Sequence, residues 1–277
     1  MNTEELITRI IDLALIEDGE DVTSTAIFPP GEQMQAVLKA KAGGVLAGLE
    51  VVRTVFRRVD PSIRCDFIKK DGDRLEPGDT IGRIAGPAVG VLRGERTALN
   101  FLQRMSGIAT RTAEYVRLVK GTKAKILDTR KTAPGQRVLD KYAVKAGGGT
   151  NHRMGLWDMA LIKDNHIDRE GSLEGSVAKV RQACPGVPVE VEARTLSDVE
   201  RLLKIGVDRI MLDNFPTDAM KKAVELVGGR VPLEASGGIT LETVRDVALT
   251  GVDYISVGDV THSVRALDIS LTIEETA

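Results

Sequence analysis

The stretches GVDRIMLDN, residues 206–214, and GVDYISVGD, residues 251–259, look like one structural unit used twice. In each, a short apolar run ends in polar or small residues. Four further runs follow this pattern: AKILDTR (124–130), MALIKDNHI (159–167), VPVEVEA (187–193) and VPLEASGG (231–238). Short, nearly continuous apolar runs are typical of strands buried on both faces, as in parallel sheets.

Helical patterns lie between several of these runs. They are SLEGSVAKVRQA (172–183), TLSDVERLLKIG (195–206), PTDAMKKAVELV (216–227) and TLETVRDVALTG (240–251). Repeated strand–helix units predict an α/β fold with a parallel sheet covered by helices. Six units favour an open, incomplete β/α barrel with fewer than eight strands. A doubly wound open sheet is the alternative.

The N-terminal part has a different pattern. Residues 3–16 carry leucine and isoleucine at helical spacing after a capping signal at Thr3, which predicts a helix. From there to about residue 95, glycine and proline interrupt short alternating pieces, which predict antiparallel strands with a helix around 48–58. The segment 95–121 predicts one long helix. DGDRLEPGDTI (71–81) resembles a turn of a lipoyl-type sandwich but lacks the attachment lysine, so we expect it to be a scaffold.

Composition excludes several classes of function. The chain has 277 residues, 42% hydrophobic and 28% charged, which suits one large or two smaller globular domains. A net charge of -2 and only 3% aromatic residues argue against a nucleic-acid partner. Cys65 and Cys184 lie far apart, so we expect no disulfide framework or structural zinc site, and a reducing cytoplasm fits. Without a signal-peptide core or a membrane-length apolar run, we expect a cytoplasmic protein with no membrane partner.

Polar side chains at the predicted strand ends mark the candidate site, because parallel β/α folds build their sites there. Lys163, Glu192 and Asp213 each follow an apolar run. We expect Glu192 and Asp213 to hold Mg²⁺, through water, or to accept hydrogen bonds from ribose hydroxyls. Salt bridges to neighbouring cations are the alternative. Because Lys163 follows MALI, we expect its aliphatic stem to be buried.

Two glycine loops follow the last two predicted strands. Ser-Gly-Gly at 236–238 precedes a helix expected near Thr240, and Ser-Val-Gly-Asp at 256–259 repeats the arrangement. Glycine lets the backbone approach a phosphate closely, and a helix N-terminus offers free N–H groups. A single Ser-Gly-Gly is more often an ordinary turn, but the tandem placement favours a phosphate site.

Two basic segments could form a local anion site in this nearly neutral chain. Arg130 and Lys131 end the first run, and His152 and Arg153 lie in a glycine-rich loop. Arginine suits bidentate recognition of carboxylate or phosphate, whereas lysine supplies a compact point charge.

The remaining cations and histidines are weighed singly. We expect Lys141 and Lys145 to be solvated surface charges, and Arg137 is an intermediate case. Hydrogen bonding to substrate is the expected role for His152, while His166 could be structural. The histidine spacing is not that of a compact metal site.

Several segments together resemble one known family. They are ALIEDGEDVTS (14–24), ERTALNFLQRMSGIAT (95–110), DTRKTAPGQRVLDKYAVKAGGGTNHRMGLWDMALIKDNHI (128–167), VEVEA, IMLDN, LEASGGI and DYISVGDVTHS (253–263). On these motifs the chain is identified as a member of the quinolinate phosphoribosyltransferases, also called nicotinate-nucleotide pyrophosphorylases (carboxylating). Gln136 departs from the family, which usually has a bulkier apolar residue there.

The resemblance implies an N-terminal α/β sandwich-like domain, residues 1–98, joined by the C-terminal tail 266–277. Residues 99–265 would form an open α/β barrel of a seven-stranded type. It also implies a homodimer or hexamer in which the N-terminal region of one subunit covers the barrel mouth of the next. The reaction would join quinolinate to 5-phosphoribosyl-1-pyrophosphate with Mg²⁺. The products would be nicotinate mononucleotide, pyrophosphate and CO2, in a step of de novo NAD synthesis.

The resemblance also assigns roles to residues. Arg96 would reach the quinolinate site across the subunit interface. Quinolinate would be held by Thr129, Arg130, His152, Arg153 and Lys163, and Lys131 would lie toward the pyrophosphate. Glu192 and Asp213 would be the acidic pair near the ribose and metal, and with Lys131 and Lys163 they form the predicted catalytic set. The 5′-phosphate would be cradled by Ser236, Gly237, Gly238 and Gly258, with His262 beside it.

Three other functions are open at this stage. A ModD-type protein of molybdenum transport operons shares the TRK, GGG and HR features, but LIKDNH with Lys163 argues for the quinolinate enzyme. A Schiff-base aldolase would use Lys163 as the nucleophile on a similar barrel. A non-catalytic sensor of sugar phosphates would have no need of Glu192 and Asp213 beside so many cations.

Overall fold

In the computed structural model, which describes residues 2–274, the two GVD segments have the same structural role. Gly206 and Gly251 adopt left-handed φ values of 73° and 92°, and the valine after each is buried. Asp208 then accepts a hydrogen bond from Val189 N at 2.8 Å, and Asp253 accepts one from Leu233 N at 2.9 Å. Each segment therefore ends a helical turn and ties its own strand to the start of the neighbouring strand.

The chain forms two compact units. The first comprises Met1–Ala113, Thr132–Gly148 and Val260–Ala277, and the second comprises Glu114–Lys131 and Gly149–Asp259. The helix α4 (Ala88–Leu118) runs through the predicted domain boundary at residue 98, so that boundary stays a prediction.

The second unit contains the predicted parallel sheet. All six predicted runs form strands: β6 (Lys125–Leu127), β7 (Ala160–Ile162), β8 (Val189–Ala193), β9 (Arg209–Asp213), β10 (Leu233–Ser236) and β11 (Tyr254–Ser256). Their order is β6-β11-β10-β9-β8-β7, and every pairing is parallel. The last strand thus pairs with the first, as in a barrel, and no reversal of order marks a doubly wound sheet.

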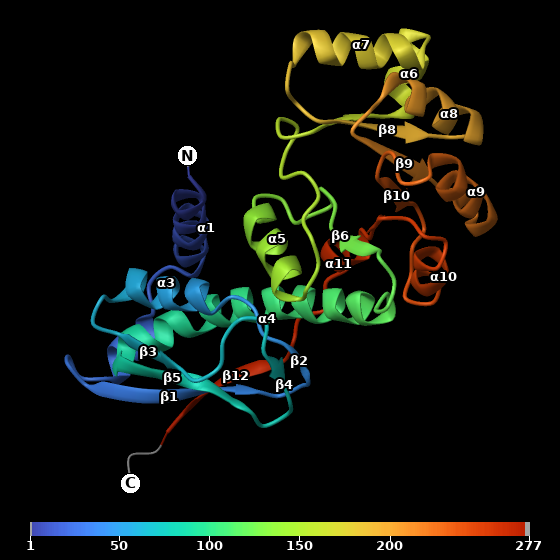
Figure 1. The fold of residues 1–277 in the computed structure, drawn as a ribbon. Helices are drawn as coiled ribbons and strands as arrows, with labels where there is room; N and C mark the ends of the chain where they lie inside the picture. Colours follow the sequence, from blue (N-terminus) through green and yellow to red (C-terminus); the bar gives the residue numbers. More distant parts are fainter. Residues whose placement is uncertain (1, 275–277) are drawn as a thin grey trace. The chain divides into compact units, whose positions relative to one another are not determined.

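The barrel is open between β6 and β7. Thr150 makes a single parallel bridge to Leu127 on the free edge of β6, at the place of a seventh strand. Helices α7 (Leu173–Ala183), α8 (Leu196–Ile205), α9 (Thr217–Val227) and α10 (Val244–Ala248) follow strands along the outside of the sheet (Figure 1). The open barrel predicted from the sequence is therefore confirmed, with a single bridge in the seventh position.

Local sequence explains the helix ends in this unit. Thr195 and Asp198 form a capping box at the start of α8, a feature that stabilises a helix by about 1 kcal/mol. The short helix α6 (Asp164–Glu170) directly follows β7 and has Lys163 as its N-cap. There, His166 Nδ1 accepts a hydrogen bond from Lys163 N at 2.9 Å, so His166 has the structural role foreseen for it.

The first unit is built on an antiparallel sheet with the order β12-β1-β5-β3. Its strands are β1 (Gln33–Ala40), β3 (Arg64–Phe67), β5 (Thr80–Pro87) and β12 (Ile269–Ile273), and β2 (Gly44–Val45) pairs separately with β4 (Arg74–Leu75). The tail strand β12 pairs along β1 from Ala36 to Ala40. Figure 1 shows α3 (Leu49–Val59) and the first part of α4 on one face of this sheet. This layered α/β arrangement agrees with the sandwich-like domain that was expected.

The helices of this unit differ in detail from the sequence predictions. The helix α1 (Thr3–Asp18) is capped by Asn2, whose side chain accepts from Glu5 N, so the cap predicted at Thr3 was off by one residue. The helix α4 begins at residue 88 rather than near 95, and α2 (Val22–Ile27) was not foreseen. Lys141, on α5 (Arg137–Ala146), is fully buried, so the expected solvated surface charge was wrong there; Lys145 is exposed as expected.

Among the residues that the structure describes, no helix has the length and apolar character needed to span a membrane.

Candidate functional site

The carboxyl ends of neighbouring barrel strands bring several predicted site residues together. Asp213, the last residue of β9, pairs in register with Ser236, the last residue of β10. Asn214, with a left-handed φ of 54°, donates from its backbone N to Ser236 O at 2.9 Å and from its side chain to Asp213 Oδ2 at 3.0 Å. The predicted ribose-side acid and the first residue of the predicted phosphate loop are thus physically linked.

Lys163 and Glu192 form an ion pair at the ends of β7 and β8. Lys163 Nζ lies 3.0 Å from Glu192 Oε1, and Asp164 N donates to Glu192 Oε2 at 3.3 Å. The salt bridge that was the alternative interpretation of Glu192 is therefore present. The Lys163 side chain is 47% exposed, so the expected burial of its stem was wrong. The cause is local, because the strand ends at Ile162 and Lys163 already caps α6.

The glycine loop after β10 is shaped by backbone conformations that favour glycine. Gly237 has a φ of 98° and Gly238 a φ of 60°. A Cβ at Gly237 would lie 2.1 Å from Asn214 Oδ1, whereas a Cβ at Gly238 would meet nothing within 4 Å. The helix expected near Thr240 begins only at Val244, because a turn occupies 241–243. Any anion at this loop would therefore meet exposed loop backbone rather than the first turn of α10.

The second glycine loop, after β11, matches the prediction more closely. Gly258 directly precedes the four-residue helix α11 (Asp259–His262), whose Asp259 accepts a hydrogen bond from Tyr115 Oη at 2.9 Å.

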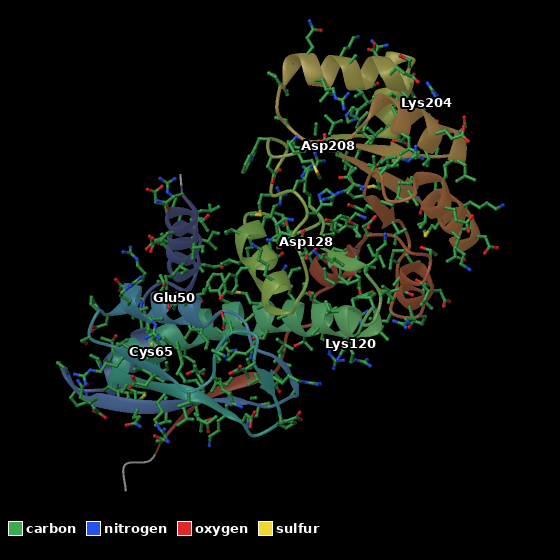
Figure 2. All side chains as sticks on the ribbon, viewed as in Figure 1. Glu50, Cys65, Lys120, Asp128, Lys204 and Asp208 are labelled. Atoms are coloured by element: carbon green, nitrogen blue, oxygen red, sulfur yellow. The ribbon has the colours of Figure 1, made fainter. Side chains whose placement is uncertain are left out.

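The segment after β6 presents the predicted cations. Asp128 is fully buried and accepts from His152 N at 2.8 Å, which ties this segment to the glycine-rich loop (Figure 2 labels Asp128). Thr129 Oγ1 accepts from Lys131 N at 3.0 Å. Arg130 and Lys131 are exposed. The turn leaves both cations at the surface, beyond the strand end.

Arg153 is the buried cation of the group. It is 8% exposed, and its Nη1 donates to Met159 O at 3.0 Å. Burial lowers the pKa of Arg153, and the nearby positive charge of Arg130 lowers it further. Two guanidinium groups that repel one another at a partly buried site form a place where an anion is stabilised.

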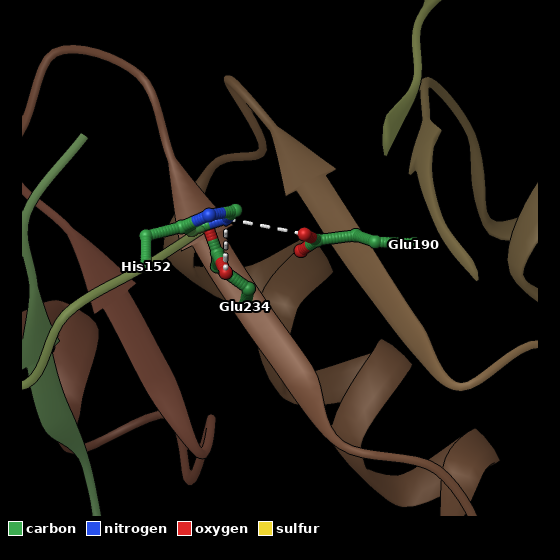
Figure 3. A group of neighbouring side chains, drawn as sticks. All are labelled: His152, Glu190 and Glu234. Carbon is green, nitrogen blue, oxygen red and sulfur yellow. Dashed lines mark ion pairs between the residues drawn. The ribbon is translucent and has the colours of Figure 1, made fainter. Parts of the chain in front are cut away.

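His152 lies between two buried carboxylates that the sequence analysis did not select. Its Nε2 is 3.1 Å from Glu190 Oε2 on β8 and 3.4 Å from Glu234 Oε2 on β10 (Figure 3). Burial on its own lowers the pKa of His152, but the hydrogen bonds and charges of the two carboxylates raise it to about 9. A backbone donor, Arg153 N, lies 2.7 Å from His152 Nδ1. Such a donor requires a lone pair on Nδ1, which opposes the doubly protonated ring that a pKa of about 9 would give at neutral pH. The hydrogen-bond geometry of this arrangement therefore assigns a single ring proton to Nε2, facing the carboxylates.

Both carboxylates belong to the barrel interior. Glu190 and Glu234 are fully buried; Glu234 accepts from Arg209 at 3.0 Å and from Ser256 Oγ at 2.5 Å. Sequence reasoning passed over them because it looked for polar residues at strand ends. The available signal was the alternation in VEVEA, where Glu190 and Glu192 fall on the same face of one strand.

Two predicted site residues, Arg96 and His262, belong to the first unit. Arg96 is exposed on α4, and His262 Nδ1 lies 2.7 Å from Ser263 Oγ.

Glu192 and Asp213 are the candidate protein ligands for Mg²⁺. Glu192 and Asp213 supply the hard carboxylate oxygens that Mg²⁺ prefers, but both Glu192 oxygens already have partners within the chain. The residues therefore fit an ion that keeps water molecules and is carried largely by a diphosphate, rather than an all-protein cage.

Comparisons with known proteins agree with this geometry. The family model "Quinolinate phosphoribosyl transferase, C-terminal domain" matches residues 108–272, and the corresponding N-terminal domain model matches 21–106. A Bacillus subtilis (strain 168) protein named a probable nicotinate-nucleotide pyrophosphorylase (carboxylating) is 47% identical, over 91% of this chain and 88% of its own length. A chloroplastic Arabidopsis thaliana protein of the same name is 44% identical, over 96% of this chain and 82% of its own length. The crystal structure of NadC from Streptococcus pyogenes superposes with a TM-score of 0.94 at 41% identity and covers 99% of both chains.

Proposed function

The chain belongs to the quinolinate phosphoribosyltransferase family, and from this premise we propose that it transfers a phosphoribosyl group from 5-phosphoribosyl-1-pyrophosphate to quinolinate. Loss of CO2 from the quinolinate moiety then gives nicotinate mononucleotide, with pyrophosphate as the other product. This reaction is a step of NAD biosynthesis. The observation that carries the proposal is the buried guanidinium of Arg153 with the positive charge of Arg130 nearby, because two neighbouring cations suit a dicarboxylate substrate.

The chain's first task in this reaction is to gather anions. Quinolinate is a dianion and the phosphoribosyl donor carries several further negative charges, so their approach requires concentrated positive charge. Arg130, Arg153 and Lys163 supply it on the quinolinate side, and Lys131 supplies it on the pyrophosphate side. We also propose that Thr129 and His152 contribute to the quinolinate site, the latter by the route argued below.

The acidic and glycine residues act on the donor sugar. The glycosidic bond breaks with positive charge developing on the ribose, so the carboxylates of Glu192 and Asp213 would stabilise that charge. Backbone N–H groups at Ser236, Gly237, Gly238 and Gly258 would hold the 5′-phosphate. The family resemblance assigns His262 to the same phosphate. Bound Mg²⁺ supplies charge neutralisation at the leaving pyrophosphate, and Glu192 and Asp213 would hold it through water.

The decarboxylation requires no added electron sink. Once the pyridine nitrogen carries the ribose it is cationic, and it stabilises the electron pair left on C2 as the C2–carboxylate bond breaks and CO2 departs. A proton from water then binds C2 and completes nicotinate mononucleotide. The chain's contribution to this step is to hold the carboxylates by Arg130 and Arg153.

The test is an assay of the folded protein with quinolinate, phosphoribosyl pyrophosphate and Mg²⁺. We expect nicotinate mononucleotide and pyrophosphate in equal amounts, and neither product when any one component is omitted. Chromatographic detection of the nucleotide gives the first readout and a coupled pyrophosphate assay the second. Absence of the nucleotide would overturn the proposal. A borohydride-trapped adduct on Lys163 with a carbonyl substrate would instead indicate an aldolase.

We further propose a homodimer or a hexamer in which Arg96 completes the quinolinate site of a partner subunit. Its support is the family resemblance and the exposed position of Arg96 on α4. Mixing Arg96→Ala with Lys163→Ala chains is expected to restore up to about a quarter of wild-type activity, because a hybrid dimer holds one intact site. Activity of the mixture after verified subunit exchange is the measurement. No recovery would contradict a shared site.

We propose the cytoplasm as the compartment. The support is that both cysteines, Cys65 and Cys184, are free.

A further inference from the structure

The interior of the barrel below the site is charged, which is unusual. Barrel interiors are commonly filled by bulky branched residues. Here two fully buried glutamates, Glu190 and Glu234, lie with Arg209 and the His152 ring in the same layer. Buried charges destabilise a fold unless they are paired, and a well-packed apolar layer would often be as stable or more so. The cluster therefore calls for a role other than stability.

The two glutamates differ in their partners. Glu234 is engaged by Arg209, Ser256 and His152. Glu190 faces the His152 ring, yet neither of its oxygens has a partner in full hydrogen-bond geometry among residues 2–274, although Oε2 lies 3.1 Å from Nε2. Among the described residues, the groups that account for its placement are His152 and the nearby positive charges of Arg153 and Arg209.

The contacts that the structure gives for the polar atoms of His152 are all with other residues of the same chain. The ring Nε2 faces the glutamates, Nδ1 accepts from Arg153 N, and the backbone N donates to Asp128. The glutamates therefore fix the ring through Nε2, and the ring fixes the backbone of the next residue through Nδ1. That residue, Arg153, carries the buried guanidinium of the anion site.

On the basis of the proposed function, we propose that Glu190 and Glu234 are positioning residues, which lock the His152 ring between strands β8 and β10 and thereby set the Arg153 guanidinium for the quinolinate carboxylate. His152 would then act through Arg153 rather than by direct contact with substrate.

A metal ion bound by the same three side chains is the competing explanation. Their ligand atoms lie within 4.8 Å of one another. However, Arg209 Nη1 already donates to the Glu234 oxygen that faces His152, which places a fixed positive charge where a metal would bind. Arg209 already supplies positive charge to Glu234, and burial raises the pKa of Glu190 to about 7, so the pair has less need of a metal cation and the positioning role is favoured.

The test compares Glu190→Leu with Glu190→Gln. Glu190→Leu is expected to raise KM for quinolinate by about tenfold to a hundredfold, while KM for phosphoribosyl pyrophosphate changes by less than about twofold. Glu190→Gln keeps an acceptor oxygen toward Nε2, so it is expected to recover most of that loss. The control is Asp253→Ala, which removes the hydrogen bond accepted from Leu233 N beside Glu234 and an ion pair with Lys123, and it should leave both KM values unchanged.

A second readout reports on the ring itself. In the ¹⁵N spectrum of the wild-type imidazole, we expect His152 with an unprotonated Nδ1 and a protonated Nε2, and we expect Glu190→Leu to shift the Nε2 signal. A lower melting temperature with unchanged KM for quinolinate would overturn the positioning role, as would a stoichiometric metal that the wild type retains on dialysis and Glu190→Leu loses. Inactivity of the wild-type protein would instead contradict the proposed function, so the two failures are distinguishable.

Discussion

Replacing Arg153 by lysine is expected to lower kcat/KM for quinolinate by roughly a hundredfold, because one buried ammonium cannot replace a guanidinium fork. Arg153 donates to Met159 O while lying beside Arg130. A lysine could keep either the contact to Met159 or the contact to a carboxylate, but not both in one geometry. Steady-state kinetics with quinolinate varied at saturating phosphoribosyl pyrophosphate measures the change.

The matched control is Arg201→Lys in the same unit. Arg201 also pairs bidentately with a carboxylate, Glu174, but at the exposed surface. Exposed pairs contribute little, so we expect kinetic constants within about twofold of wild type. Equal kinetic losses in both variants would show that the effect is a general consequence of arginine replacement, and would contradict the role given to Arg153.

Gly237→Ala is expected to lower kcat/KM for phosphoribosyl pyrophosphate by roughly a hundredfold, since misplacement of a binding group by about 1 Å can cost that much. The added Cβ would lie 2.1 Å from Asn214 Oδ1, at a φ of 98° that alanine rarely adopts. Relief of the clash moves the Asn214 side chain, which donates to Asp213. One methyl group would therefore disturb both the phosphate loop and the acid on the neighbouring strand. The measurement is kinetics with the phosphoribosyl donor varied.

The control variant Gly206→Ala separates the effect of backbone strain from the effect of displacing a neighbouring side chain. Gly206 also has a left-handed φ, 73°, but a Cβ there would meet nothing within 4 Å. We expect it to cost about 1 kcal/mol in free energy of unfolding and to leave KM for the donor unchanged. If Gly237→Ala behaved in the same way, the close approach between Gly237 and Asn214 would have no part in binding.

The order of strands and helices in the barrel could be predicted from the sequence because it depends on patterns that repeat. Each of the six apolar runs forms a strand of the barrel. In both GVD segments, the glycine ends a helical turn before the strand begins. Side-chain environment was harder to predict. Lys141 and Lys145 are both lysines of the same helix, and nothing in the sequence distinguishes their environments. Of these two residues, only Lys141 is fully buried. The difference depends on what packs against α5, which is a tertiary property.

The candidate site shows the same division. The sequence identifies Lys163, Glu192 and Asp213 because each lies at or next to the end of an apolar run. The structure places all three at the carboxyl-terminal end of the parallel sheet. Glu190 and Glu234 were missed because they lie one layer lower, inside strands where an apolar residue is the rule. Their proposed role depends on contact with His152, which lies in a loop about forty residues before Glu190. Spacing along the chain cannot reveal such a meeting.

The antiparallel pairing of β12 with β1 has a consequence for biosynthesis. The strand β1 ends by residue 40, but among the described residues its outer edge is covered by residues 269–274. While the chain is being translated, that edge stays without its native partner until residues 269–273 have been made. Exposed strand edges recruit other chains, so the nascent protein passes through a long aggregation-prone interval. A chain released before residue 269 would contain all six barrel strands, but its first sheet would lack the strand that pairs with the outer edge of β1.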